Sequence, residues 1–171
     1  PKGLDHILFI FGLFLFSSSL KKLITQITIF TIAHSITLIF VSLSLMKINP
    51  QIVEPIIALS IVYVGIENIF KNYVKEYLRY VVILFFGLLH GLGFALVLSD
   101  IGYRSTDLFI NLISFNIGIE VAQISIVLVL YLLVALNFAK NKNYRMFFQV
   151  PSSILISSIG LYWFFERINF F

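Results

Sequence analysis

The chain contains no cysteine, so several kinds of chemistry are excluded before any motif is considered. Without a thiol there is no disulfide, no thiolate metal ligand and no cysteine nucleophile. Any metal site must therefore be built from imidazole, carboxylate, amide or hydroxyl groups. Histidine is the strongest metal ligand in this set, and the chain has only three histidines.

Charged residues are also scarce, at 12% of the 171 residues, whereas hydrophobic residues make up 60%. With a mean hydropathy of +1.02, the chain is too apolar for a soluble globular domain. Apolar stretches long enough to cross roughly 30 Å of hydrocarbon recur along the whole length, which leaves no room for a soluble domain. We therefore expect an all-α polytopic membrane helical bundle whose main partner is the lipid bilayer.

Six transmembrane helices are expected in a single domain over residues 1–171. Their predicted ranges are about 4–20, 23–46, 52–70, 80–99, 108–139 and 146–166. Pro151 is expected to kink the sixth helix. The chain starts at Pro1 with neither an initiator methionine nor a basic leader, so we expect upstream residues to be missing.

Lysine and arginine alternate between the two sides of this predicted bundle. One side carries eight of them, namely Lys21, Lys22, Lys71, Lys75, Arg79, Lys140, Lys142 and Arg145, and the other carries Lys2, Lys47, Arg104 and Arg167. The positive-inside rule places the first set in the cytoplasm and both displayed termini on the outer side of a bacterial cytoplasmic membrane. The pI of about 9.4 reflects this loop bias, and no pattern favours nucleic-acid binding.

His90 lies between glycines inside the fourth predicted helix. An ionisable side chain in a lipid environment is costly and usually faces the protein interior, so His90 is a functional candidate. Gly87 and Gly91 are four residues apart, and such a small-residue pair lets another helix approach closely at the level of the histidine. The sequence therefore predicts a partner helix facing His90.

Antiparallel placement of the six spans brings several polar groups together in the outer half of the bundle. His34 and His90 fall near the middle of their helices and Glu120 in the outer half of the fifth, with Asp5 and His6 above them. Imidazole nitrogen and carboxylate oxygen suit nickel, cobalt or zinc, and helical bundles assemble such sites from facing helices. The candidate metal ligands are therefore Asp5, His6, His34, His90 and Glu120.

Four further polar residues are expected to support these ligands. Asn116 and Gln123 share a helix face with Glu120 and are expected to orient its carboxylate. Ser35 adjoins His34, and Glu54 opens the third helix, where the helix dipole alone favours a carboxylate. A simpler interpretation stays open for each histidine: a hydrogen bond to a neighbouring helix for His90, nearby hydroxyls for His34, and a solvated pair with Asp5 for His6.

Several stretches along the chain resemble the HupE/UreJ family of small membrane proteins, which is linked to nickel or cobalt uptake. The resemblance rests on residues 1–9, 30–38, 53–55, 58–63, 86–95, 115–120 and 163–167. The first-helix motif of that family is His, five residues, then Asp-His, and Asp5 and His6 match its second half. This match implies a metal-binding role for both residues, and the first histidine of the motif would fall upstream of Pro1.

The fourth helix has one histidine where the nickel permeases of the family have two and a glutamate, so the chain resembles the second HupE/UreJ subfamily. The favoured prediction is a nickel or cobalt permease without a nucleotide-binding motif. An intramembrane zinc-dependent hydrolase would use the same His and acid cluster, with metal-activated water. A non-transporting metal-binding accessory subunit is the third alternative, and the oligomeric state is open.

Overall fold

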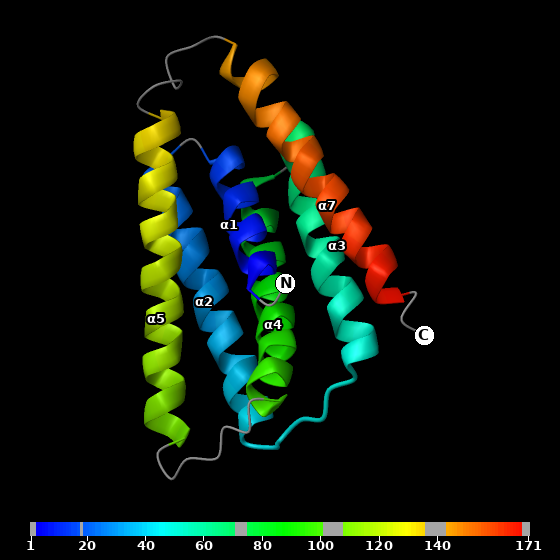
Figure 1. The fold of residues 1–171 in the computed structure, drawn as a ribbon. Coiled ribbons are helices and arrows are strands. Elements are labelled where there is room, and N and C mark those ends of the chain that lie inside the picture. Colours follow the sequence, from blue (N-terminus) through cyan, green and yellow to red (C-terminus); the bar gives the residue numbers. More distant parts are fainter. Residues whose placement is uncertain (1–2, 18, 71–74, 101–107, 136–142, 169–171) are drawn as a thin grey trace.

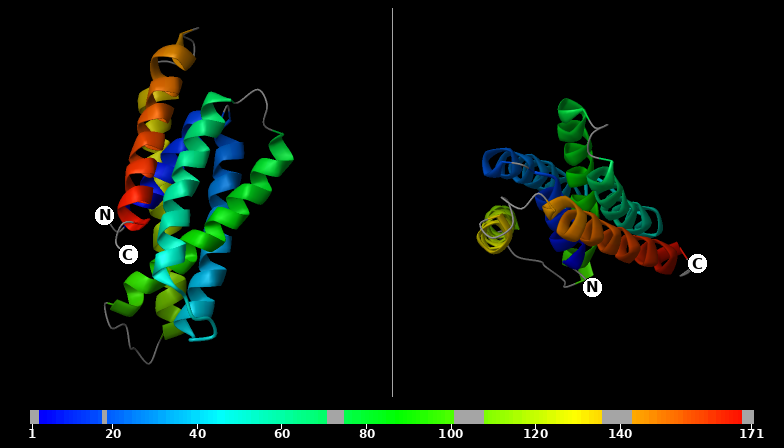
Figure 2. Two further views of the ribbon diagram at one scale, coloured as in Figure 1. Left: turned by 90° about the vertical axis from the view of Figure 1, so that its right-hand side faces the viewer. Right: turned by 90° about the horizontal axis from the view of Figure 1, so that it is seen from above.

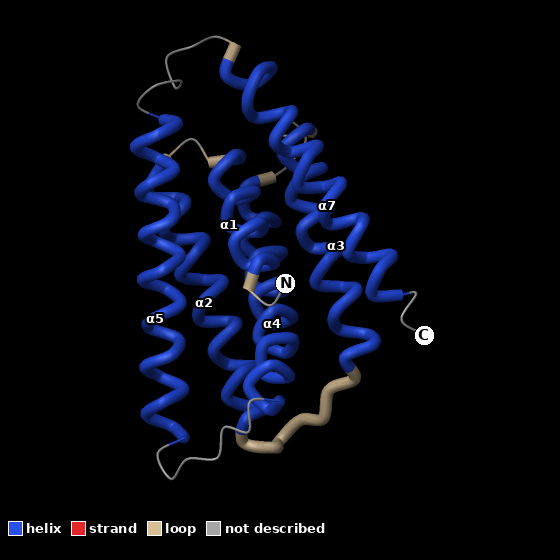
Figure 3. The backbone as a smooth tube through the Cα atoms, in the orientation of Figure 1, coloured by secondary structure: helices blue, strands red, loops and turns tan. Residues whose placement is uncertain are grey.

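The computed structural model describes residues 3–17, 19–70, 75–100, 108–135 and 143–168, which contain helices and no strands (Figure 3). The helices are α1 (Leu4–Phe16), α2 (Leu20–Ser42), α3 (Pro50–Ile69), α4 (Glu76–Asp100), α5 (Leu108–Leu130) and α7 (Val150–Ile168). Two π-helical turns extend them: η2 (Tyr131–Ala135) continues α5, and η3 (Arg145–Gln149) leads into α7. The predicted all-α bundle is confirmed.

Five of these helical segments are long and apolar enough to cross a membrane. The exception is α1, whose 13 residues extend about 20 Å, less than the thickness of the hydrocarbon core. The difference from the expected range 4–20 lies at Ser17 and Ser19, where the Ser17 hydroxyl donates to the Ser19 carbonyl and accepts from the Ser19 N–H. Such local bonds compete with helical hydrogen bonds and end the helix early.

The remaining helix ends differ from the expected ones by a few residues. α2 begins at Leu20 and ends at Ser42, shortly before Ser44, which has a positive φ of 59°. α3 begins at Pro50 because the Asn49 side chain accepts a hydrogen bond from the Gln51 N–H. The predicted extension of the fifth helix over residues 136–139 lies outside the described residues.

The π-helical turn η3 directly precedes α7, in which Pro151 is the second residue, and the kink expected there stays a prediction. Pro151 has no N–H and cannot donate to the carbonyl one turn earlier. Widening of the preceding turn accommodates that missing bond. The last span is therefore η3 and α7 together.

Two pairs of helices lie side by side in the bundle, α2 with α4 and α3 with α7 (Figures 1 and 2). Seen from above, α1 lies in the centre between these pairs, and α5 packs on the outside against α1 and α2 (Figure 2). α1 is the most enclosed helix, with Phe9, Ile10 and Leu13 fully buried. Most of α5 faces outward, as expected for a lipid-contacting helix.

One end of the bundle collects the basic residues, and we refer to it as the basic end. α1 and α3 end there, and α2, α4 and η3 begin there. Lys22 pairs with Glu76, Arg145 donates to the Ile69 carbonyl, and the Arg79 guanidinium lies over the Phe16 ring. Five of the basic residues in the topology count lie outside the described residues, namely Lys2, Lys71, Arg104, Lys140 and Lys142.

The glycine pair on α4 brings this helix against α2, as its spacing predicts. A Cβ at Gly87 would lie 2.6 Å from the Phe30 carbonyl oxygen, and one at Gly91 would overlap with the His34 carbonyl. The Thr37 hydroxyl donates to the Leu88 carbonyl across the same interface, at 2.8 Å. The two backbones are therefore in contact at the level of His34 and His90.

We predict that Gly91→Ala destabilises the protein, because its methyl group must push α2 and α4 apart. Overpacking of this kind costs about 1–3 kcal/mol. Thermal unfolding in detergent micelles measures the effect. Gly118→Ala is the matched control, since a Cβ at Gly118 meets nothing within 4 Å and alanine favours the helix. Equal unfolding temperatures for both variants would contradict this packing.

Candidate metal centre

The three histidines meet at mid-depth in the bundle, each from a different helix. Their positions in the chain are 6 in α1, 34 in α2 and 90 in α4. The ring centroid of His6 lies 5.0 Å from that of His34 and 4.9 Å from that of His90, and both contacts are edge to face. His6 Nε2 and His34 Nδ1 are 3.4 Å apart, within hydrogen-bonding range. We refer to these three residues as the histidine cluster.

The short length of α1 places His6 in this cluster. His6 lies in the first turn of α1, whereas His34 and His90 lie near the middle of α2 and α4. α1 therefore begins part-way along the bundle (Figure 1). The expectation that Asp5 and His6 lie above the other two histidines needs correction for His6, because it is in ring contact with both.

Two imidazole nitrogens in the cluster are buried and without a hydrogen-bond partner, namely His34 Nε2 and His90 Nδ1. Both side chains are fully buried. The other nitrogen of His90, Nε2, lies 2.9 Å from the hydroxyl of Ser60 on α3. The Ser60 hydroxyl donates its proton to the Ile57 carbonyl. A buried nitrogen without a partner is costly, so these two atoms favour a bound ligand.

The two candidate carboxylates have partners of their own outside the cluster. Both oxygens of Asp5 accept from the Arg167 Nη2, at 2.9 and 3.1 Å, and Arg167 also donates to the Glu54 carbonyl. Glu120 accepts from the Thr28 hydroxyl at 3.0 Å. Among the described residues, no group of three or more His, Asp or Glu side chains is arranged to hold a metal ion as it stands.

The predicted supporting residues are likewise engaged elsewhere. Gln123 accepts from Thr31, and Asn116 donates to the Leu112 carbonyl of its own helix, with its side-chain oxygen buried and unpartnered. Ser35 donates to the Thr31 carbonyl. The side chain of Glu54 is exposed. Their proposed support of the ligands therefore requires changes of partner.

Sequence reasoning missed Ser60 and Arg167 as residues that hold His90 and Asp5. Ser60 is a small hydroxyl residue in an apolar helix and carries no pattern of its own. Arg167 entered the sequence analysis through the topology count and the family resemblance, and neither indicated an ion pair with Asp5. Both partnerships join residues far apart in the chain, so only the packing of α3 and α7 reveals them.

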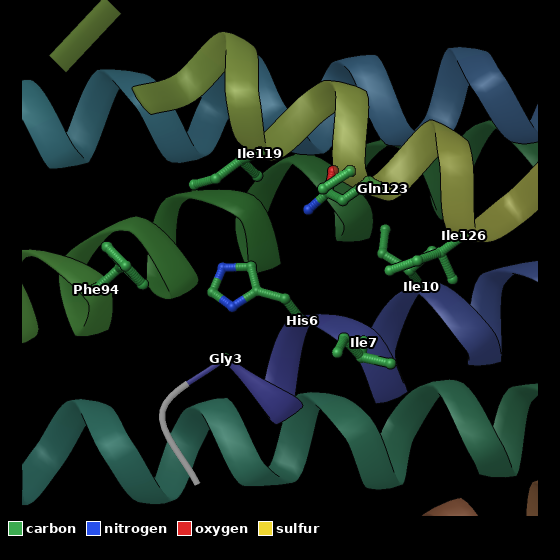
Figure 4. A pocket seen from close by; sticks show the side chains of 9 residues that line it. Gly3, His6, Ile7, Ile10, Phe94, Ile119, Gln123 and Ile126 are labelled. Carbon is green, nitrogen blue, oxygen red and sulfur yellow. The ribbon is translucent and has the colours of Figure 1, made fainter. Parts of the chain in front are cut away.

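A cavity of about 190 Å³ lies beside the cluster, between α1 and α5 (Figure 4). Its walls are apolar except for His6 and Gln123, whose side chains point into it (Figure 4), and Phe94 also lines it. The remaining lining residues are Gly3, Ile7, Ile10, Ile119, Ala122 and Ile126. The cavity can accept an apolar group next to an imidazole.

Comparison with known protein families identifies the family to which this chain belongs. Residues 1–167 match the family described as HupE / UreJ protein. The chain belongs to the HupE/UreJ family. This membership agrees with the resemblance noted in the sequence and links the protein to nickel and cobalt transport. Searches of curated proteins and of solved structures found no match. The HupE/UreJ protein is thus a multi-pass membrane protein whose three histidines converge.

We predict that Ser60→Ala destabilises the HupE/UreJ protein, because His90 Nε2 loses its partner in a fully buried place. Leaving such a group unsatisfied costs roughly 1–3 kcal/mol. The unfolding temperature in detergent micelles measures this loss. Ser125→Ala is the control, since the Ser125 hydroxyl is exposed and bonds only the Val121 carbonyl of its own helix. A loss as large in the control would contradict the role given to Ser60.

Proposed function

We propose that this HupE/UreJ protein is a permease for a divalent metal, nickel or cobalt, and that the histidine cluster is its intramembrane binding site. The observation that carries the proposal is the meeting of three imidazoles from three helices, with two buried nitrogens left without partners. Imidazole is a preferred ligand of nickel, cobalt and zinc. The family's link to nickel and cobalt transport supports the same cargo.

Binding requires rearrangement of side chains, which suits a transported ion. The rings now meet edge to face, so their nitrogens must turn toward one point, and the χ2 torsion of histidine is soft enough to allow this. Asp5 and Glu120 are proposed to add oxygen ligands by exchanging Arg167 and Thr28 for the ion. Ligands that exchange partners release an ion more readily than a rigid cage, as transport requires.

The proposed direction of metal transport follows from the distribution of charged residues between the two ends of the bundle. The basic end is assigned to the cytoplasm by the positive-inside rule, and the ion would approach the cluster from the opposite end. Movement of a cation toward the basic side would then depend on the membrane potential or on a partner. Under this proposal, the partner would be a second copy of the chain in a homo-oligomer, or an accessory subunit.

An intramembrane zinc-dependent hydrolase is the second candidate, and the apolar cavity favours it. A hydrolase in the bilayer needs space for an apolar substrate next to the metal, and the cavity reaches His6. Three imidazoles with an open position are a common catalytic zinc site, in which the metal activates a water molecule. This reading keeps the same ligands but makes the metal a resident cofactor.

We predict that His90→Ala and His34→Ala each weaken nickel binding at least about tenfold, since each removes one of three nitrogen ligands. Glu120→Gln is expected to slow nickel uptake into vesicles. The measurements are metal content of the purified protein and uptake after reconstitution. Glu166→Gln, at an exposed carboxylate, is the control. If wild-type protein neither binds nor carries nickel or cobalt, the permease proposal fails.

Filling the cavity tests whether the proposed ion path uses it. Ala122→Phe places a ring in the cavity beside His6. For a permease, nickel uptake is expected to stay within about twofold of wild type, because the ion does not use an apolar cavity. Val121→Phe is the matched control on the lipid-facing side of α5. Abolished uptake in Ala122→Phe alone would contradict the ion path proposed here.

A further inference from the structure

Each histidine of the cluster has a phenylalanine one helical turn closer to the basic end. These are Phe9 in α1, Phe30 in α2 and Phe86 in α4. Phe9 stacks on Phe30 with ring centroids 5.0 Å apart, and its ring meets that of Phe86 at 5.8 Å. We refer to these three residues as the phenyl layer.

The phenyl layer lies directly against the histidines. The His90 ring centroid is 5.2 Å from that of Phe9 and 5.1 Å from that of Phe30. Behind the phenyl layer, toward the basic end, the core continues with four buried aliphatic side chains, each at most 2% exposed. These are Leu13, Ile27, Val64 and Ile83. A hydrated cation cannot pass through packing of this kind.

Beyond this apolar core lies a buried ion pair between Glu67 of α3 and Arg79 of α4. The Arg79 Nη1 donates to Glu67 Oε2 at 2.7 Å, and the two side chains are 1% and 3% exposed. The Arg79 guanidinium also lies 3.5 Å from the ring centroid of Phe16, at the end of α1. The neighbouring Asn68 donates to the Gly12 carbonyl, which ties α3 to α1 at the same depth.

This ion pair is incompletely satisfied. Glu67 Oε1, Asn68 Oδ1 and the Nε and Nη2 of Arg79 are all buried without a hydrogen-bond partner. A buried pair stabilises a fold only when its remaining polar atoms are satisfied, so this arrangement is poor as a purely structural device. The unpartnered oxygens of Glu67 and Asn68 are hard ligands available to a cation. The guanidinium now occupies the place of such a cation beside Glu67.

We propose that the phenyl layer and the Glu67–Arg79 pair form the inner gate of the permease, with Glu67 as a second cation-binding position. This inference rests on the proposed function. The ion leaves the histidine cluster when the phenyl layer separates, and it displaces Arg79 from Glu67 on its way to the basic end. α1 supplies His6, Phe9, Leu13 and Phe16, one residue at each level, so displacement of this short helix opens every level.

The absence of cysteine from the chain makes the gate directly testable. A single Ile27→Cys variant in reconstituted vesicles is treated from the basic side with a charged thiol reagent, with and without nickel on the opposite side. The labelling rate is expected to rise several-fold with nickel. Thr25→Cys, exposed at the basic end, should label in both conditions, and Ile32→Cys, which faces lipid, in neither.

The possible outcomes distinguish failure of the proposed gate from failure of the proposed permease function. Nickel uptake by the Ile27→Cys variant without any change in its labelling would overturn the gate alone. Absence of nickel uptake by wild-type vesicles would overturn the permease and the gate with it. Direct binding of nickel to the introduced thiol would slow labelling, which is opposite to the expected change and therefore cannot mimic it.

Glu67→Gln tests the second cation position. Nickel uptake is expected to fall at least about tenfold, while equilibrium nickel binding at the histidine cluster stays as in wild type. Glu76→Gln is the matched control, because Glu76 forms an exposed ion pair with Lys22 at the same end. If the single variant does not fold, the double variant Glu67→Gln with Arg79→Gln removes both charges together. Uptake equal to wild type in the folded variant would overturn the role of Glu67.

Discussion

The contact between the backbones of α2 and α4 is the feature on which the candidate site depends. Only glycine at positions 87 and 91 allows it, because a Cβ at either place would meet the α2 backbone. This contact sets His90 beside α2 at the level of His34. α1 then completes the cluster because it is short and begins at mid-depth, where its first turn carries His6.

The two candidate carboxylates have hydrogen-bond partners outside the histidine cluster. A charged group in a low-dielectric interior is costly unless it is paired, and Asp5 and Glu120 accept hydrogen bonds from Arg167 and Thr28. The unpartnered nitrogens of His34 and His90 are therefore not engaged by either carboxylate.

The histidine cluster also divides the bundle into two unlike halves. Toward the basic end, aromatic and aliphatic side chains fill the core up to the buried Glu67–Arg79 pair. On the other side of the cluster, Phe94 contacts His6 and His34 at ring-centroid distances of 6.1 Å and borders the apolar cavity. The histidine cluster is thus separated from the basic end by a packed apolar core.

The sequence by itself determined the membrane location, the all-helical fold and the close approach of another helix at the glycines that flank His90, because hydropathy and small-residue spacing are local properties of the chain. Only the tertiary structure decided which polar groups meet. The short α1 placed His6 level with His34 and His90, and packing of α7 against α3 brought Arg167 to Asp5. Sequence reasoning assigned both carboxylates to the cluster because depth along a helix can be estimated from residue number. The direction in which a side chain points around the helix depends on contacts with residues far away in the chain.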